Sequence, residues 1–150
     1  MPLLQDEHRQ QLRDYLARNL QDPVRVHLFT QRASLVATPV PPCPTCQETE
    51  DLLKEVSGLS DKVLLEVHDL VTEAQEARRL GVDRVPALVY QGKNKGVLRY
   101  FGLPAGHEIA VLVEDLGDLS RGTTRLSAPT RQSLAGLTRL AHIKVMVLPT

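Results

Sequence analysis

Hydrophobic and polar residues follow two different periods along the first third of the chain. In residues 5–20, "QDEHRQQLRDYLARNL", apolar side chains recur every three to four positions between charged ones. This spacing predicts an amphipathic surface helix. In residues 22–30, "DPVRVHLFT", a turn-forming Asp-Pro precedes apolar side chains at every second position. That alternation predicts a strand.

The remaining pattern continues this alternation of helices and strands. Helices are predicted over 45–58, 71–81 (with Thr72 as its cap), 104–120 and within 127–140; a strand over 62–69; a β-hairpin over 86–102; and a loop over 31–42. Alternating elements with a closing antiparallel hairpin are typical of an α/β fold. We therefore expect a mixed central sheet flanked by helices on both faces.

The end of the chain repeats an earlier pattern. Residues 143–150, "IKVMVLPT", resemble residues 24–31, "VRVHLFTQ", in their alternation of apolar and polar positions. The repeat is either an extra edge strand or the first strand of a second, similar unit. We accordingly divide the chain into a first unit, residues 1–120, and a segment over 121–150 made of a linker, a short helix and a strand.

Composition excludes several classes of partner. The chain of 150 residues has 18 Lys and Arg against 18 Asp and Glu, and 3% aromatic residues. Neither a basic surface for nucleic acid nor aromatic side chains for base stacking are indicated. No stretch approaches the length of about 20 apolar residues that spans a bilayer. The sequence predicts a cytoplasmic protein without nucleic-acid or membrane partners.

The two cysteines lie together in "PPCPTCQET", residues 41–49. A cysteine directly before a helix lies where unpaired N–H groups and the helix dipole favour a thiolate, which lowers the pKa of Cys43 from about 8.5 to about 7 or below. Pro44 fits the first helical position. Cys46 is then one turn in and close enough to form a disulfide. The spacing predicts attack by Cys43 on a disulfide and resolution by Cys46.

Two other interpretations of this pair remain open. Zinc bound by two cysteines needs two further ligands. The histidines that could supply them are scattered singly and none shows ligand spacing: His8, His27, His68, His107 and His142. We therefore expect no metal site. Two inert buried cysteines are the second alternative.

A hydrophobic residue and a proline open the predicted hairpin. Val85 and Pro86 follow a helix and precede a strand, a place where proline is tolerated for structural reasons alone. In a thiol-exchange site, a proline after a cis peptide bond would instead turn the backbone of Val85 towards a bound substrate strand. We expect the substrate-binding surface to comprise Pro44, Thr45, Val85 and Pro86.

These residues resemble the thioredoxin fold. "CPTC" is similar to the redox centres of glutaredoxins, and "VPA" resembles the cis-proline segment. The stretch containing "RYFGLPAGHE", together with "HIKVMVLPT", resembles the N-terminal unit of the glutaredoxin-like protein disulfide oxidoreductases, which join two thioredoxin-fold units. The resemblance covers residues 5–150.

The resemblance implies a thiol–disulfide oxidoreductase that acts on protein disulfides, with Cys43 as nucleophile, Cys46 as resolving thiol and no cofactor beyond their redox-active disulfide. It also implies a flavoprotein reductase as a partner. Thioredoxin has a buried acid at the position of Ala37, so Glu66 is a candidate for proton transfer to Cys46; otherwise it is a solvated strand residue. A non-enzymatic binding module and a glutathione-linked glutaredoxin are the alternatives. Residues 143–148 offer a strand for homodimerisation.

Overall fold

A computed structural model describes residues 3–32 and 41–148 of the chain. Its elements, in chain order, are α1 (Asp6–Asn19), β1 (Val24–Thr30), α2 (Cys46–Ser57), β2 (Val63–Asp69), α3 (Ala74–Leu80), β3 (Ala87–Gln91), β4 (Leu98–Phe101), α4 (Glu108–Arg121) and α5 (Ala128–Ala135). Every predicted helix and strand up to residue 121 is present. Most of the predicted loop over 31–42 lies outside the described residues.

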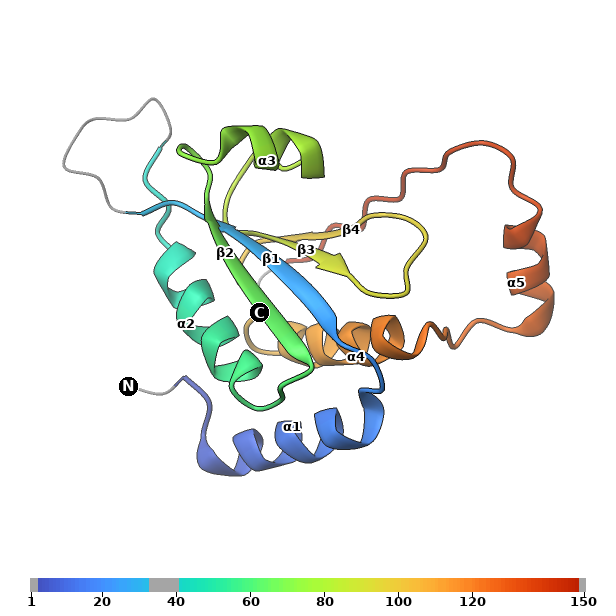
Figure 1. Cartoon of the computed structure of the whole chain (residues 1–150), viewed down its shortest axis with the longest axis horizontal. Helices are drawn as coiled ribbons and strands as arrows, with labels where there is room; N and C mark the ends of the chain where they lie inside the picture. The colour runs from blue at the N-terminus through green and yellow to red at the C-terminus, as the bar shows by residue number, and fades with distance from the viewer. Residues whose placement is uncertain (1–2, 33–40, 149–150) are drawn as a thin grey trace.

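The four strands form one mixed sheet in the order β2-β1-β3-β4. β1 runs parallel to β2 and antiparallel to β3, which is antiparallel to β4. β1 is therefore hydrogen-bonded on both sides and occupies the middle of the sheet (Figure 1). The expected mixed central sheet is confirmed.

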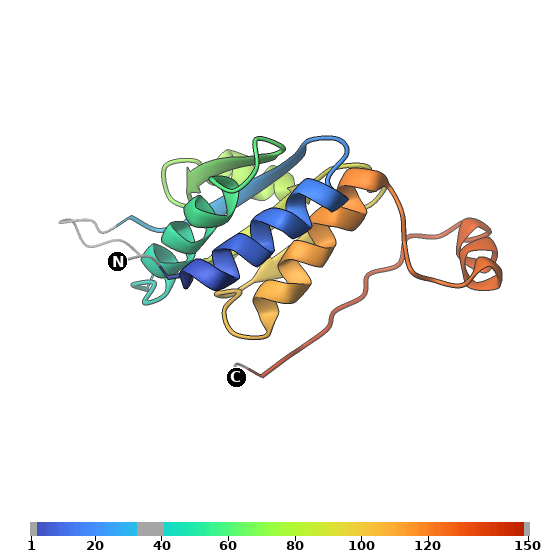
Figure 2. The ribbon, with the colours of Figure 1, turned by 90° about the horizontal axis from the view of Figure 1, so that it is seen from below.

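Helices cover both faces of this sheet, as expected, but unequally. α1, α2 and α4 lie side by side on one face (Figure 2). Their apolar side chains pack with alternate residues of β1, Val26 and Leu28, in the larger of two hydrophobic clusters. Among the described elements, α3 alone covers the other face. There Phe29 and Val89 pack against Leu80 in a smaller cluster.

A buried serine fixes the start of β1. The Ser120 hydroxyl accepts hydrogen bonds from the backbone N–H groups of Gln21 (2.8 Å) and Asp22 (3.0 Å) and donates to the Asp22 carbonyl at 2.5 Å. All three bonds join α4 to the turn between α1 and β1. The hydroxyl is therefore fully used at a position without solvent access.

A carboxylate fixes the chain just beyond the other end of β1. Asp69 ends β2 and accepts hydrogen bonds from the N–H groups of Arg32 (3.0 Å), Val71 and Thr72 (both 2.9 Å). Burial acts to raise the pKa of Asp69, but the bonds from Thr72, Arg32 and Val71 outweigh it and hold the pKa below its ordinary value. Thr72 was predicted to cap α3. It lies instead in this turn, and Glu73 precedes the helix.

The segment after α4, residues 122–148 (the C-terminal segment), contributes no buried residue. α5 opens with Ser127, whose side chain accepts a hydrogen bond from the Thr130 N–H at 3.3 Å. Beyond it the chain returns past the sheet without regular structure (Figure 1). Residues 143–148 form no strand here, since no neighbouring strand in the described part of the chain pairs with them, and the predicted strand stays a prediction.

No helix in the described parts of the chain has the length and apolar character needed to cross a membrane.

Candidate functional site

Cys43 and Cys46 are joined by a disulfide, with an S–S distance of 2.11 Å and a Cα–Cα distance of 5.5 Å. The pair lies at the start of α2, on the three-helix side of the sheet. In this oxidised state each sulfur is bonded to the other. The pair can therefore store two electrons as a dithiol and release them as a disulfide.

The two cysteines differ in exposure. Cys46 is the first residue of α2 and is only 1% exposed, while Cys43 is half-buried. Between them Pro44 is exposed and Thr45 is half-buried. An approaching molecule therefore reaches Cys43 first.

The start of α2 differs from the expectation in one detail. Pro44 precedes the helix instead of occupying its first position, and Thr45 is the N-cap, with φ −110° and no capping bond from its side chain. The Thr45 carbonyl instead accepts bonds from the N–H (2.9 Å) and the hydroxyl (2.7 Å) of Thr49. The first N–H groups of α2 have no acceptor within the helix. They and the positive end of the helix dipole lie next to Cys43.

The second predicted part of the site is the segment before β3. The peptide bond between Val85 and Pro86 is cis. Pro86 is buried and its carbonyl accepts a hydrogen bond from the Gly102 N–H at 2.9 Å, whereas Val85 is half-buried. Val85 is therefore the member of this pair that a bound molecule can contact.

The topology brings both parts to one end of the sheet. α2 connects the parallel strands β1 and β2, so its first residue lies at the end of the sheet where β1 finishes. β3 is antiparallel to β1, and Phe29 near the end of β1 pairs with Ala87 at the start of β3. The disulfide and the Val85–Pro86 bond consequently occupy the same end of the sheet.

Two further side chains at this end escaped the sequence analysis. Ala87 also pairs with Phe101, which is 41% exposed. The guanidinium of Arg84 lies over the Phe101 ring, 5.2 Å from its centre. The sequence did show an aromatic residue, Phe101, at the end of the hairpin's second strand. It follows another aromatic residue in "YFG", so nothing marked it as the exposed one.

Glu66 does not fit the proton-transfer role considered for it. Its carboxylate forms ion pairs with Arg25 at 3.1 Å and His27 at 3.3 Å on the α3 side of the sheet. Cys46 belongs to α2, on the opposite side. The position of Ala37 lies outside the described residues.

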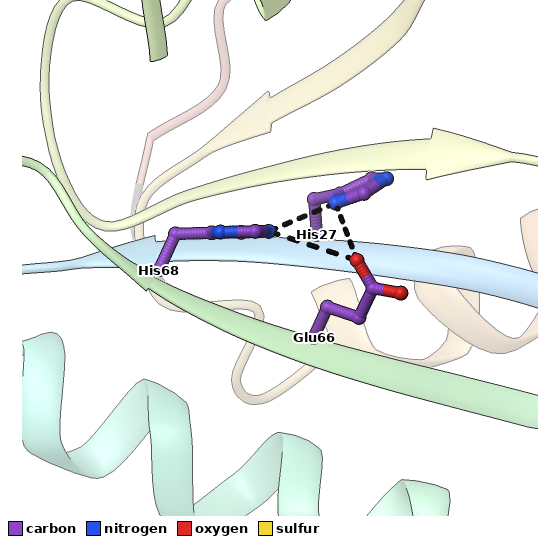
Figure 3. A group of neighbouring side chains, drawn as sticks. All are labelled: His27, Glu66 and His68. Atoms are coloured by element: carbon purple, nitrogen blue, oxygen red, sulfur yellow. Dashed lines mark hydrogen bonds and ion pairs between the residues drawn. The ribbon is translucent and has the colours of Figure 1, made fainter. Parts of the chain in front are cut away.

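The expectation that every histidine stands alone is wrong for His27 and His68. The Nδ1 atom of His27 and the Nε2 atom of His68 are 2.9 Å apart, with Glu66 beside them (Figure 3). Parallel pairing of β1 with β2 creates this cluster. Separation along the sequence concealed it, because strand register was unknown.

An apolar cavity of about 600 Å³ lies away from the sulfurs. It opens between α1, α2 and α4 and is lined by side chains that include Leu12, Leu52 and Ile109. Neither cysteine contributes to its wall. The disulfide centre is therefore a surface site and not part of this cavity.

Comparison with solved structures shows where this fold occurs. A protein disulfide oxidoreductase from Aeropyrum pernix is 28% identical, with a TM-score of 0.74 over 89% of this chain. The alkylhydroperoxide reductase protein AhpF from Enterococcus faecalis is 22% identical, with a TM-score of 0.73 over 89% of this chain. A thioredoxin from Halobacterium salinarum is 20% identical, with a TM-score of 0.50 over 74% of this chain and 84% of its own. The last two show the fold alone.

The chain spans 55% of the Aeropyrum protein and 61% of the Enterococcus protein. No curated protein sequence matches it. The resemblance to protein disulfide oxidoreductases with a thioredoxin fold is confirmed by the Aeropyrum structure and by the oxidised Cys43–Cys46 pair. Residues 36–114, more than half of the chain, match the thioredoxin domain, and the chain therefore belongs to the thioredoxin domain family.

Proposed function

We propose that the protein is a thiol–disulfide oxidoreductase that acts on protein disulfides through Cys43 and Cys46. In the reducing direction, the Cys43 thiolate attacks one sulfur of a substrate disulfide and releases the other as a thiolate. The Cys46 thiolate then attacks the Cys43 sulfur and releases the second substrate thiol. The Cys43–Cys46 disulfide that remains has given two electrons to the substrate.

The difference in exposure between the two sulfurs is the observation that carries this proposal. Cys43 is accessible and lies beside the first N–H groups of α2, whereas Cys46 is 1% exposed and bonded to it. A nucleophile must reach its substrate, while a resolving thiol needs to reach only the nucleophile. A deeply buried Cys43 would favour an inert binding module, but Cys43 is only half-buried.

The surroundings support an extended protein segment as substrate. As the substrate-binding residues we assign Pro44 and Thr45, which lie between the cysteines, and Val85 and Pro86, where Val85 offers the contact and the buried Pro86 orients it. The exposed Phe101 extends this surface along the same end of the sheet. In this role the backbone of Val85 hydrogen-bonds to the substrate strand, and Phe101 offers an apolar contact to its side chains.

The partner that restores the dithiol is a reductase that supplies two electrons, and a flavoprotein thioredoxin reductase meets this need. The Aeropyrum relative is named a protein disulfide oxidoreductase, which favours protein substrates for this chain as well. No bound cofactor is required, because the disulfide itself carries the electrons. The cytoplasmic location stays a prediction from the sequence.

A matched pair of serine variants tests the assignment of roles. Cys46→Ser keeps the nucleophile but lacks the resolving thiol, so it should accumulate a mixed disulfide with a disulfide-bonded peptide, detected by mass spectrometry at Cys43. Cys43→Ser should accumulate none, because Cys46 is buried. With dithiothreitol as electron source, the wild type should reduce the peptide faster than dithiothreitol alone, and this acceleration should be lost in Cys43→Ser and strongly reduced in Cys46→Ser.

The pH dependence of alkylation tests the activation of Cys43. Iodoacetamide should label Cys43 of the reduced protein. The dependence of the labelling rate on pH should give a pKa well below about 8.5, the ordinary pKa of a thiol. Cys46 should react far more slowly. Slow labelling of both cysteines, with no mixed disulfide in Cys46→Ser, would identify an inert fold and overturn the proposal.

A further inference from the structure

A second cluster of chemically reactive side chains lies on the side of the sheet that faces α3. It consists of His27 from β1 and Glu66 and His68 from β2 (Figure 3). His27 pairs directly with Glu66 in the parallel register, and His68 follows two residues later on the same face. Their ligand atoms all lie within 4.8 Å of one another. The redox proposal gives this cluster no role.

The orientation of His68 is fixed by a carboxylate behind it. Its Nδ1 atom lies 2.8 Å from Oε1 of Glu73, which can only accept, so Nδ1 carries a proton and donates it. The lone pair of the neutral ring is then on Nε2, which points at His27. A histidine whose second ring nitrogen donates to a carboxylate is the usual arrangement of a metal ligand.

Glu66 and His27 complete the arrangement. Oε1 of Glu66 is paired with Arg25 at 3.1 Å, while Oε2 lies 3.3 Å from Nδ1 of His27. Within the described part of the chain, Nε2 of His27 is buried with no hydrogen-bond partner. Because His68 Nε2 accepts, Nδ1 of His27 is the donor of the 2.9 Å bond between them. When a cation replaces this bond, the ring proton of His27 moves from Nδ1 to Nε2, and Nδ1 then presents its lone pair to the ion.

The cluster is both rigid and reachable. His68 stacks between the rings of His27 and Phe29, with centre distances of 5.2 Å and 4.8 Å. The side chains of His27 and His68 are 5% and 13% exposed, and that of Glu66 is 40% exposed. Two ligands are therefore held in place by packing, and the third lies at the surface where an ion can enter.

We infer that His27 Nδ1, His68 Nε2 and Glu66 Oε2 bind a divalent transition-metal ion, with Zn²⁺ the best match. Two imidazoles and a carboxylate form a ligand set that zinc accepts, and bonds of 2.0–2.1 Å in a tetrahedron place ligand atoms about 3.3 Å apart. The three observed separations, 2.9, 3.3 and 3.9 Å, lie on both sides of that value. Shifts of a few tenths of an ångström suffice, and the fourth position is open to water.

The surrounding charges favour a cation. Glu73 lies behind His68, and Glu76 is close enough that both histidines contribute to lowering its pKa, after its larger hydrogen bond and Coulombic interaction with Arg79. Of the nearby cations in the described part of the chain, Arg25 is already paired with Glu66 and Arg79 with Glu76. Binding would join β1 to β2 and, through Glu73, to the start of α3.

The test uses the oxidised protein, in which the Cys43–Cys46 disulfide cannot bind zinc. Zn²⁺ is titrated against a chromogenic chelator with wild type, Glu66→Gln and His68→Gln. We expect each variant to weaken Zn²⁺ binding by at least about tenfold, and Glu73→Gln to weaken it by about 10- to 100-fold. His8→Gln and His142→Gln, which alter exposed histidines outside the cluster, should leave the affinity unchanged.

Thermal unfolding provides the second measurement. Zn²⁺ at one fixed concentration above the wild-type Kd should raise the Tm of the wild type and of a Cys43→Ser, Cys46→Ser double variant, and should raise the Tm of Glu66→Gln and His68→Gln clearly less. Folded variants are recognised by an unchanged circular dichroism spectrum. Equal affinity of Glu66→Gln, His68→Gln and wild type would overturn the inference, and so would absence of Zn²⁺ binding by the wild type. Because the double variant lacks the redox pair, this result is independent of the proposed oxidoreductase activity.

Discussion

Two segments with a similar pattern of residues adopt different structures in this molecule: one is a buried strand and the other is exposed and irregular. "VRVHLFT" at 24–30 forms β1 at the centre of the sheet, where Val26 and Leu28 are fully buried. "IKVMVLP" at 143–149 has apolar residues at the corresponding positions, but Val145 and Val147 are 81% and 57% exposed and residues 143–148 form no strand. Pattern gives a segment the capacity to form a strand, while its neighbours decide whether it does so.

The neighbours of β1 can be named. It pairs with β2 on one side and β3 on the other, the helices of both faces cover it, and Ser120 and Asp69 hold the backbone at its two ends. The C-terminal segment lacks all of these within the described structure. If this comparison is correct, matched changes in the two segments should have very different effects.

The largest difference is expected between Leu28→Ala and Val147→Ala, which occupy corresponding positions. Truncation of Leu28 leaves a cavity in the larger hydrophobic cluster and should lower the free energy of unfolding by about 3–4 kcal/mol. Val147→Ala removes no buried contact and should change it by less than about 0.5 kcal/mol. Urea denaturation of the two variants decides the matter, and similar losses would refute the comparison.

Ser120→Ala tests the attachment at the start of β1. It leaves the N–H groups of Gln21 and Asp22 without their acceptor in a buried place, so we expect a loss of about 2 kcal/mol in unfolding free energy. Ser133→Ala, an exposed serine of α5, serves as the control and should be neutral. A neutral Ser120→Ala would show that water replaces these bonds without cost.

Asp69→Asn tests the attachment beyond the other end of β1 through its dependence on pH. The pKa of Asp69 is lower in the folded protein than its ordinary value of 3.8, so its contribution is complete well above that pH and disappears as the pH falls through the lowered value. We expect wild type to exceed the variant by about 1 kcal/mol at pH 7. Denaturation curves between pH 7 and pH 2 should converge, and a difference that persists at low pH would contradict the role of the charge.

The smallest effect on stability is expected from Val145→Asp in the C-terminal segment. The unfolding free energy should stay within about 0.5 kcal/mol of wild type, because Val145 is exposed. If residues 143–148 pair between two copies, as the sequence suggests, wild type should sediment partly as a dimer and the variant as a monomer. Identical sedimentation of both proteins would contradict a homodimer formed through residues 143–148.

The sequence predicted well those elements whose hydrophobic pattern matches the burial that their neighbours in the fold impose. The helix predicted over 45–58 and the strands predicted over 22–30 and 62–69 were placed to within two residues, because apolar periodicity and turn residues marked their ends. The cysteine pair was identified from its position between a strand and a helix, and the disulfide agrees with that. The roles of the two sulfurs and of the substrate-binding residues stay predictions.

What the sequence could not supply was contact between distant residues. His27 and His68 meet only because β1 and β2 pair in one particular register, and a shift by one residue would turn them to opposite faces. Phe101 reaches the redox end of the sheet through the pairing of β4 with β3. Residues 143–148 have no pairing strand within the described chain, and their pattern alone could not show this, since pairing is a property of two segments.

The end of α4 has a practical consequence for how the protein is cut by proteases. Gly122, with φ 68°, closes the helix with a bond of 2.8 Å from its N–H to the Asp118 carbonyl, and the chain then leaves the sheet. Proteases bind extended, accessible backbone, which residues 137–148 provide and β1 does not. Brief digestion should therefore cut within residues 137–148 before it cuts β1, and the disulfide, the Val85–Pro86 bond and the histidine cluster all lie before these cuts.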